Sequence, residues 1–188
     1  MAVLPIRIAG DPVLRQKAKR VRTIDDSIQK LIDDMIETMR DAPGVGLAAN
    51  QVGVLLRVVV IEVPDEENEV TDPEEPPARQ LYTLINPQIV KRSGERLLDE
   101  GCRSVPGYKA VTPRSVRVTV KGLNREGTEV RIKAEDNILA EALEHEIDHL
   151  NGILYIDHLE SMDELVKLEE ATAPEEEVPS PAAGGSAP

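Results

Sequence analysis

The segment His145-Glu146-Ile147-Asp148-His149 constrains the fold of this chain more tightly than any other part of the sequence. Asp136-Asn137 before it can cap a helix, and Asn151-Gly152 after it can end one, so we expect a helix that runs to about residue 150. Residues four apart share one face of a helix. The two histidines therefore point the same way, and the rest of the fold has to be arranged around that face.

This spacing is typical of a metal site. Both imidazoles can reach one cation, and Glu146 projects beside them, where it can serve water held on that cation. The alternative is that the two histidines are surface or core residues with satisfied hydrogen bonds. The sequence contains 3 histidines, and two of them fall in this one pattern, which favours the metal site. We interpret the third, His158, as structural.

A catalytic metal usually has three protein ligands and one open position for water. No downstream segment matches the HxxGxxH extension that supplies a further ligand in zinc peptidases of the HExxH type. The one soft donor in the chain is Cys102, within Glu100-Gly101-Cys102-Arg103-Ser104. A lone cysteine is also a common small, buried, apolar residue. The residues alone therefore leave the third ligand open.

The order of the other predicted elements indicates the fold class. Apolar residues from Ile28 to Met39 recur at helical spacing, and Pro43-Gly44 follows them, which predicts an amphipathic N-terminal helix near 25–41. Several strands come next, and the helix that carries the histidines follows the strands. This order is typical of an α+β fold, in which we expect short antiparallel strands and small sheets packed around a central metal-binding helix.

The strands are predicted from β-branched and alternating segments. Residues 55–63 form a continuous apolar run typical of a buried strand, and 64–79 are rich in Pro and acids, which predicts a long flexible loop. Short strands broken by turn residues are expected within 81–87 and 88–102. Residues 115–135 alternate apolar and polar side chains on either side of a turn, which indicates a hairpin.

The length of 188 residues fits one domain. We expect a metallohydrolase catalytic domain over residues 1–161. Residues 162–188 are expected to form a short helical extension followed by a disordered tail, because the tail is acidic and rich in Pro, Ala and Gly.

The charge of the chain is unevenly distributed. The formal net charge is −13, but residues 62–79 and 160–188 account for most of the excess acid and leave the remainder close to neutral. Acidic segments repel the phosphate backbone of nucleic acids and so disfavour binding to them. The absence of Trp and Phe also argues against stacked aromatic platforms for single strands. We therefore expect no direct binding of nucleic acid.

The sequence also predicts a compartment. Its single cysteine cannot form an intramolecular disulfide, which suits a reducing environment. The first residues have neither the apolar core of a signal peptide nor the composition of a transit peptide, and no apolar run approaches the ~18 residues that span a bilayer. We expect a cytoplasmic protein without a membrane segment.

Three segments together resemble a known family. Residues 44–51, 100–104 and 145–149 read GVGLAANQ, EGCRS and HEIDH, and they are similar in sequence, order and spacing to the GxGLAAxQ, EGCxS and HExDH motifs of peptide deformylases. The likeness extends from about Ile6 to Leu159. The resemblance implies removal of the formyl group from the N-terminal formylmethionine of new polypeptides, with release of formate.

The resemblance also implies a role for individual residues. One divalent metal would be held by Cys102, His145 and His149, with Fe²⁺ expected and Zn²⁺, Ni²⁺ or Co²⁺ able to replace it. Glu146 would act as the general acid and base toward water on that metal, and Gln51 would hydrogen-bond the developing oxyanion.

The substrate-binding residues follow from the same motifs. The backbones of Gly46 and Leu47 would line the cleft, Val45 would border the methionine pocket, and the backbone N–H of Arg103 would face the oxyanion. Without the other motifs, residues 44–53 would equally well be a tight turn with small residues for close packing.

One residue departs from the family pattern. The position after Cys102 is commonly Leu in the family, and here it is Arg103. One interpretation is a solvent-directed side chain without effect. The other is a cation that attracts acidic peptides or pairs with the loop at 62–79. Asp148 is expected to support the metal helix by pairing with a base such as Arg114.

The expected partners are formylmethionyl peptides and nascent chains, with transient proximity to the ribosome. Two other functions remain open from the sequence: a peptidase that cuts internal amide bonds, and a homologue that binds N-termini or metal without turnover. The missing downstream His opposes the first, and the intact Glu146 opposes the second.

Overall fold

The structure is a computed structural model that describes residues 2–41, 44–65 and 78–168. The predicted flexible loop at 64–79 and the predicted disordered tail therefore lie largely outside the described residues. In the described part of the chain, no helix has both the length and the apolar character needed to cross a membrane.

Two helices of the described chain match the predicted ones closely. Helix α1 spans Asp26–Asp41, and the side chain of Asp25 accepts hydrogen bonds from the backbone N–H groups of Ser27 and Ile28 at its start. Helix α2 spans Ile138–Leu150, and Asn137 caps it by accepting from the N–H of Ala140 at 3.0 Å. Polar side chains at both starts satisfy N–H groups that have no partner inside the helix.

Within the described residues, eight strands form two antiparallel sheets, which confirms the α+β prediction. The larger sheet has the order β1-β2-β3-β6-β7, and its strands are β1 Gly46–Ala48, β2 Val58–Pro64, β3 Arg79–Ser93, β6 Arg117–Leu123 and β7 Glu129–Glu135. The smaller sheet has the order β4-β5-β8, with β4 Arg96–Cys102, β5 Val105–Arg114 and β8 Val166–Lys167. Four short 3-10 helices complete the described structure: η1 Pro12–Arg15, η2 Ala49–Val52, η3 Tyr155–His158 and η4 Met162–Glu164.

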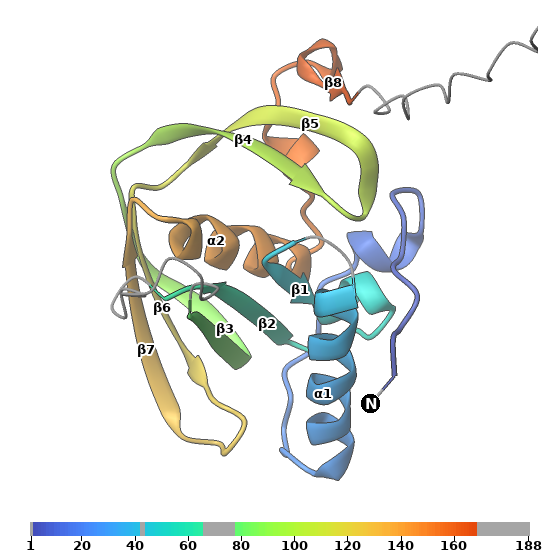
Figure 1. Ribbon diagram of the computed structural model, residues 1–188, viewed down its shortest axis with the longest axis vertical. Helices are drawn as coiled ribbons and strands as arrows, with labels where there is room; N and C mark the ends of the chain where they lie inside the picture. The colour runs from blue at the N-terminus through green and yellow to red at the C-terminus, as the bar shows by residue number, and fades with distance from the viewer. Residues whose placement is uncertain (1, 42–43, 66–77, 169–188) are drawn as a thin grey trace, which may run out of the picture.

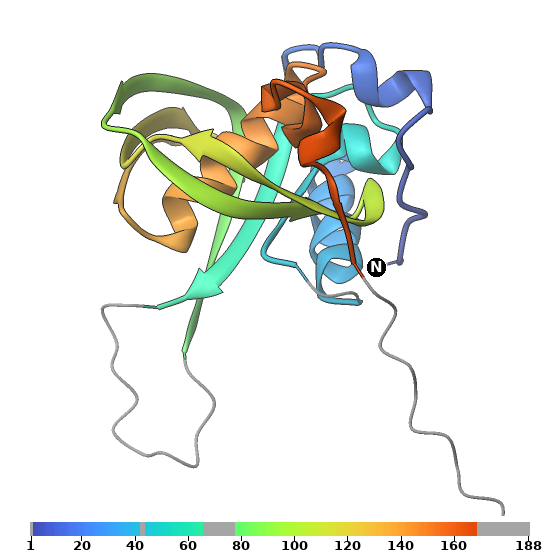
Figure 2. The same cartoon turned by 90° about the horizontal axis from the view of Figure 1, so that it is seen from above.

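Helix α2 lies between the two sheets (Figure 1). Its apolar residues pack on one face of the larger sheet, where they meet Val59, Ile61, Val118 and Val120 in one core cluster. Helix α1 packs on the opposite face of β2, against Val58 and Val60. Because successive residues of a strand point to opposite faces, the continuous apolar run of β2 serves both helices. Figure 2 shows the same arrangement from above.

The strand boundaries differ from the predicted ones in three places. Strand β3 is a single 15-residue strand rather than two short ones, with register shifts in its pairing to β6. Strand β5 was not predicted, because Pro106, Gly107 and Pro113 interrupt its pattern. The predicted helical extension after residue 161 is instead one short 3-10 turn followed by β8, which pairs with β5.

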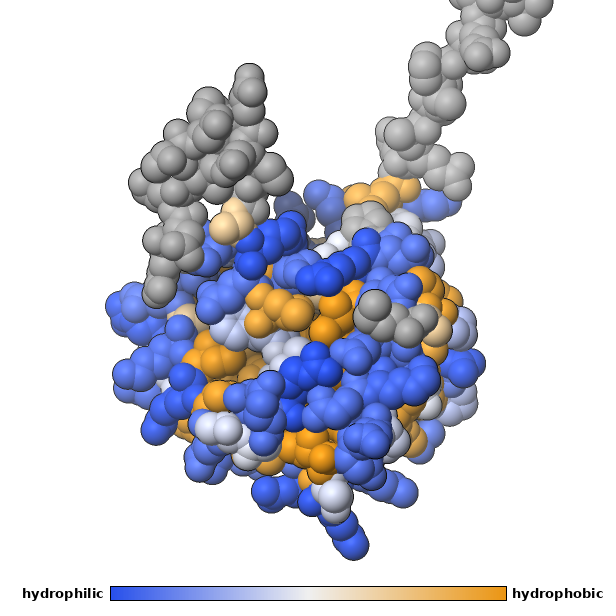
Figure 3. Space-filling model, turned by 60° about the horizontal axis from the view of Figure 1, so that its bottom comes forward, coloured by the Kyte–Doolittle hydropathy of each residue, from blue (hydrophilic) through white to orange (hydrophobic). Residues whose placement is uncertain are grey.

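Hydrophilic side chains cover most of the face seen in Figure 3, and apolar side chains gather in patches between them. A third apolar cluster lies under the smaller sheet around Leu14, Leu154 and the buried Tyr155. The hydroxyl of Tyr155 donates to the carbonyl of Tyr108 at 3.2 Å and so joins η3 to β5. The smaller sheet is thereby fixed over the helix that carries the histidines.

Candidate metal centre

Cys102, His145 and His149 come together, as the family resemblance implies. The Cys102 Sγ lies 3.2 Å from the His149 Nε2, and the two Nε2 atoms of the histidines are 3.2 Å apart. The ligand atoms of all three residues lie within 4.8 Å of one another. The histidines come from α2, and the cysteine comes from the end of β4, where the pairing with β5 is irregular.

The donor set fits a small divalent cation. Metal–ligand distances of about 2.0–2.3 Å at tetrahedral angles separate the donor atoms by roughly 3.3–3.6 Å, and the two 3.2 Å separations lie close to that range. A thiolate with two imidazoles suits iron, cobalt, nickel or zinc. The fit concerns the class of metal and leaves open which of these the protein holds.

The charges around the histidines also suit a cation. Burial alone would lower the pKa of His145, but hydrogen bonds to Cys102 and Glu100 and the charge of Glu146 raise it well above its ordinary value. Burial and the adjacent His145 hold the pKa of His149 well below its ordinary value. The negative groups around His145 would equally favour a metal cation at its ring, and burial favours for His149 the neutral form that ligates a metal.

Glu100 orients His145 from behind. Its carboxylate bonds to the His145 Nδ1, so the Nε2 faces the cysteine. Burial disfavours the charged form of this acid, yet the hydrogen bonds from His145 and Arg114 outweigh burial and lower the pKa of Glu100. A carboxylate that fixes the ring and tautomer of a ligating histidine is a common support of metal sites.

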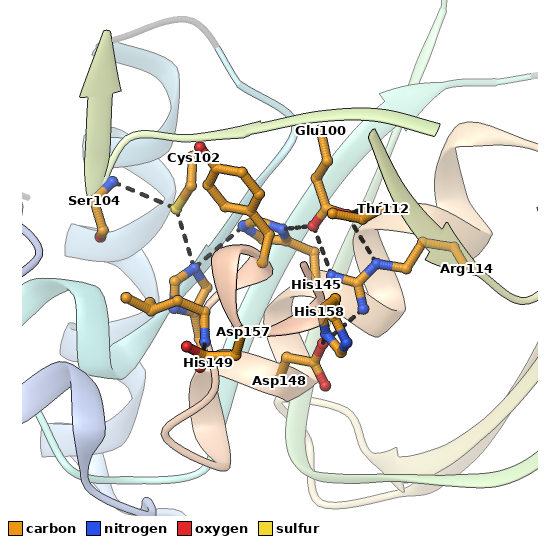
Figure 4. A network of polar contacts seen from close by, with 12 residues as sticks. Glu100, Cys102, Ser104, Thr112, Arg114, His145, Asp148, His149, Asp157 and His158 are labelled. Carbon is orange, nitrogen blue, oxygen red and sulfur yellow. Dashed lines mark hydrogen bonds and ion pairs between the residues drawn. The ribbon is translucent and has the colours of Figure 1, made fainter. Parts of the chain in front are cut away.

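A buried ionic network extends this support (Figure 4). Arg114 on β5 donates to Glu100 at 2.9 and 2.6 Å and to Asp148 at 2.6 Å, which is the pairing expected for Asp148. His158 contacts Asp148 at 2.8 Å, in agreement with its structural interpretation, and the hydroxyl of Thr112 donates to Glu100. The network joins β4, β5 and α2 directly behind the histidines.

Glu146 faces a pocket beside the three donor atoms. Burial raises the pKa of Glu146 to about 7, and its Oε2 atom has no hydrogen-bond partner among the described residues. A Cβ atom added to Gly46 would lie 2.4 Å from the Glu146 Oε1. The close approach of strand β1 to the carboxylate therefore requires glycine at this position.

Gln51 on η2 is held with its amide nitrogen toward the site. The Oε1 accepts from the backbone N–H of Ala48 at 2.9 Å, and because that group can only donate, the amide NH₂ must face the other way. The Nε2 lies 3.5 Å from the Cys102 Sγ and 3.3 Å from the Ser104 Oγ. Ser104 was not singled out from the sequence, although it falls within the EGCRS segment.

The other predicted residues line or flank a cavity of about 310 Å³. Val45, Gly46 and Arg103 are part of its lining, together with Gly44, Gln51, Glu100, Gly101, Cys102, Glu141, Ala142, His145 and Glu146. Leu47 is not among the lining residues, since its fully buried side chain packs in the core beneath α1. Glu141 is a lining residue that no sequence pattern identified.

The side chain of Arg103 does not point freely into solvent. Its guanidinium donates to the carbonyls of Thr38 and Met39 at 3.2 and 2.6 Å, at the end of α1. A Cβ atom on Gly44, where φ is +150°, would lie 2.7 Å from the Arg103 Nη2. Arg103 thus ties the ligand-bearing turn to α1 and covers one wall of the cavity.

Comparison with known proteins agrees with this geometry. The family model described as polypeptide deformylase matches residues 3–165. A peptide deformylase from Dehalococcoides mccartyi is 51% identical over 179 residues, which cover 95% of this chain and 97% of the relative. One from Halothermothrix orenii is 52% identical over 157 residues, which cover 84% and 94%.

Solved structures show the same likeness. The crystal structure of peptide deformylase from Ehrlichia chaffeensis has a TM-score of 0.77 and 42% sequence identity, and the match covers 87% of this chain and 91% of that one. A class I type b peptide deformylase from Acinetobacter baumannii, solved with Met-Ala-Ser bound, has a TM-score of 0.74 and 32% identity over 84% and 99% of the two chains. Matched over nearly all of its described length, the chain belongs to the polypeptide deformylase family.

Proposed function

We propose that Cys102, His145 and His149 form the metal centre at which this chain, a metal-dependent peptide deformylase, removes the formyl group from N-terminal formylmethionine. The observation that carries the proposal is the convergence of three donor atoms within 4.8 Å beside a pocket that contains Glu146. A divalent metal bound there would act as a Lewis acid that lowers the pKa of water and polarises the formyl carbonyl. Ferrous iron is the metal we propose for the cell, with zinc, nickel or cobalt able to replace it.

Glu146 is proposed as the carrier of the proton. As water attacks the formyl carbon, the carboxylate accepts the proton, and it delivers that proton to the amine nitrogen when the carbon–nitrogen bond breaks. The products are formate and a free N-terminal methionine. The raised pKa of Glu146, at about 7, supports this role, because an acid–base group works best when its pKa is near the working pH.

Gln51 and the backbone N–H of Arg103 are proposed as donors to the developing oxyanion. The Gln51 amide is preorganised, since the Ala48 N–H fixes its oxygen and leaves the NH₂ directed at Cys102 and Ser104. Donors held in place before the reaction stabilise the transition state without reorganisation. Each such donor is worth about 3–4 kcal/mol of barrier.

The formylated peptide is proposed to lie along the backbones of Gly46 and Leu47, with Val45 at the border of the methionine pocket. The Met-Ala-Ser bound to the relative from Acinetobacter baumannii supports a peptide ligand. We further propose nascent chains as the physiological substrates, transient proximity to ribosomes and a cytoplasmic location. Residues 1–161 are proposed as the catalytic domain, with 162–188 as an extension whose β8 adds to the smaller sheet.

The decisive experiment compares three peptides in an assay for released formate, with iron-loaded protein prepared without oxygen. We expect formate from formyl-Met-Ala-Ser, no hydrolysis of acetyl-Met-Ala-Ser and no cleavage of an internal amide bond. Glu146→Gln, which keeps the shape of the side chain, should abolish turnover while metal content is retained. Cleavage of internal bonds would instead support the HExxH peptidase, and metal binding without any turnover by the parent would support the non-catalytic homologue.

A further inference from the structure

A group of cations lies on the face of β3, β6 and β7 that points away from α2. Alternate residues of β6 and β7, such as Val118, Val120 and Ala134, are buried in the core beneath α2. The residues between them point to the opposite side of the sheet. On that side stand Lys91, Lys121, Arg131 and Lys133, all exposed, and these four residues are called the basic face below. Arg117, Glu129 and Glu135 lie on the same side at the strand ends.

The pairing of the strands brings like charges directly opposite each other. Lys121 and Arg131 are Cα partners across β6 and β7. Thr119 pairs with Lys91 on one side and with Lys133 on the other, so the three residues form one row across the sheet. Like charges placed opposite each other in a sheet are destabilising. The arrangement therefore has a cost to stability that an anionic partner would relieve.

No acidic side chain of the described chain forms an ion pair with the basic face, although Glu129 and Glu135 lie on the same side of β7. Its four members make no ion pair among the described residues, whereas the neighbouring Arg117 is paired with Glu135 at 2.6 Å. The contrast with a formal net charge of −13 is large. The negative net charge led us to expect no binding of nucleic acid. Most of the excess acidic residues, however, lie in other parts of the sequence.

The surface between the cations is hollowed. Lys91, Arg131 and Lys133 line a depression of about 600 Å³, together with the paired Arg117 and Glu135. Lys121 also lines a second one of about 860 Å³ with Arg20, Arg57, Arg92 and Glu129. There Arg92 is paired with Glu144 of α2 at 2.9 Å and Arg57 donates to the carbonyl of Pro87 at 2.9 Å. The basic face is therefore limited to its four cations.

We propose that the basic face binds the sugar-phosphate backbone of RNA without reading its sequence. Lys121 and Arg131 are about 4.8 Å apart across adjacent strands, Lys91 and Lys133 are about 9.6 Å apart across two strand spacings, and Arg131 and Lys133 are about 6.7 Å apart along β7. The cations therefore follow an extended polyanion rather than converge on one small anion. Backbone contacts alone can supply such binding. The basic face has no aromatic side chain on which bases could stack. Binding would therefore depend on the phosphates and not on the bases.

An acidic protein is the less suitable occupant. Protein interfaces depend on a few buried aromatic or apolar anchors, and the residues that alternate with the core on β6 and β7 here are charged or Thr, apart from Leu123 at one end. RNA is favoured over DNA because it is the polymer near newly made polypeptides, and in this one respect the inference rests on the proposed function.

The binding experiment uses the full chain and a fluorescently labelled, unstructured RNA of about 20 nucleotides, with anisotropy measured over a series of KCl concentrations. Four phosphate contacts to a single strand predict a slope of log K against log salt of about −3, and a Kd of roughly 1–100 µM at physiological salt. The double variant Lys121→Gln/Lys133→Gln should weaken binding at least about tenfold at low salt and make the slope shallower by about 1.4.

The matched control removes the same charge from the smaller sheet, in the double variant Lys109→Gln/Lys167→Gln. It should bind RNA like the parent, because these lysines lie on β5 and β8. Formate release, measured in parallel, should be unchanged in the Lys121/Lys133 variant, so that failure of RNA binding and failure of the proposed activity are read separately.

Three outcomes would overturn the inference. The first is an unchanged affinity and salt slope in the Lys121/Lys133 variant. The second is an equal loss in the control variant, which would mean that total charge alone governs binding. The third is tighter binding of labelled polyglutamate than of RNA at the same salt, which would assign the face to an acidic protein instead.

Discussion

Gln51 is the residue whose geometry makes the sharpest catalytic prediction. Gln51→Ala should lower kcat by about 10²–10³-fold, which corresponds to about 3–4 kcal/mol, and should change KM little, because the amide is proposed to act mainly when charge develops on the oxygen. Steady-state formate release measures both constants. Gln29→Ala is the matched control, because the Gln29 amide also makes a hydrogen bond to the backbone, donating to the Arg125 carbonyl at 2.7 Å, and Gln29 does not line the cavity at the metal centre. A large rise in KM with unchanged kcat would contradict the assigned role.

Arg103 gives a second prediction for a single residue. Arg103→Leu removes the two hydrogen bonds to the end of α1 and should destabilise the fold by about 1.5–3 kcal/mol. KM should rise as the wall at Gly44 loosens, while metal content stays the same. Arg103→Lys should restore the charge but not the geometry, because an ammonium lacks the planar fork of guanidinium. An unchanged thermal midpoint and KM in Arg103→Leu would return Arg103 to the solvent-directed interpretation.

The same variant tests the earlier idea that Arg103 attracts acidic peptides. Because the guanidinium is directed at the carbonyls of α1, the ratio of kcat/KM for formyl-Met-Glu-Ser to that for formyl-Met-Lys-Ser should be the same in the parent and in Arg103→Leu. A ratio that falls in the variant would show that the side chain selects by charge.

At the scale of the elements, one buried cation, the guanidinium of Arg114, joins β4, β5 and α2. Arg114→Met leaves Glu100 and Asp148 buried without the guanidinium that they share and should cost about 3–5 kcal/mol of unfolding free energy. The pKa values of both acids are lowered in the parent, so the difference should be full at neutral pH and shrink as the pH falls through those lowered values. Denaturant unfolding at several pH values measures it. The control Arg117→Met, at an exposed pair, should change stability little, and an equally small effect of Arg114→Met would contradict the network's importance.

Elements with a strong local signal could be predicted from the sequence, and those made by distant pairing could not. Periodicity and caps identify α1 and α2, and alternation around residues 124–127 identifies the β6–β7 hairpin, because each depends on neighbours in the sequence. Strand β5 has Pro and Gly within it, and β8 is two residues long, so only their partners reveal them. In the site, motif residues gave the ligands, whereas the role of Ser104 and the direction of the Arg103 side chain depend on contacts across the fold.

At the scale of the whole molecule, the metal would connect two layers that meet at α2. Because the ligands come from β4 and α2, a cation bound by the folded state alone should stabilise it by about 3–4 kcal/mol at 100 to 1,000 times its Kd. Removing the metal with a chelator should therefore lower the thermal midpoint measured by calorimetry, and adding Ni²⁺ or Co²⁺ should restore it. Cys102→Ser should reduce this dependence. A midpoint that is the same with and without metal would contradict a shared centre.

The contact between Gly46 and Glu146 limits which substitutions residue 46 can accept during evolution. A methyl group at residue 46 would overlap the carboxylate, so a codon change that enlarges the residue should also displace the side chain proposed to carry the proton. An inhibitor that presses on the backbone at Gly46 would consequently leave the gene no simple route to resistance at that position.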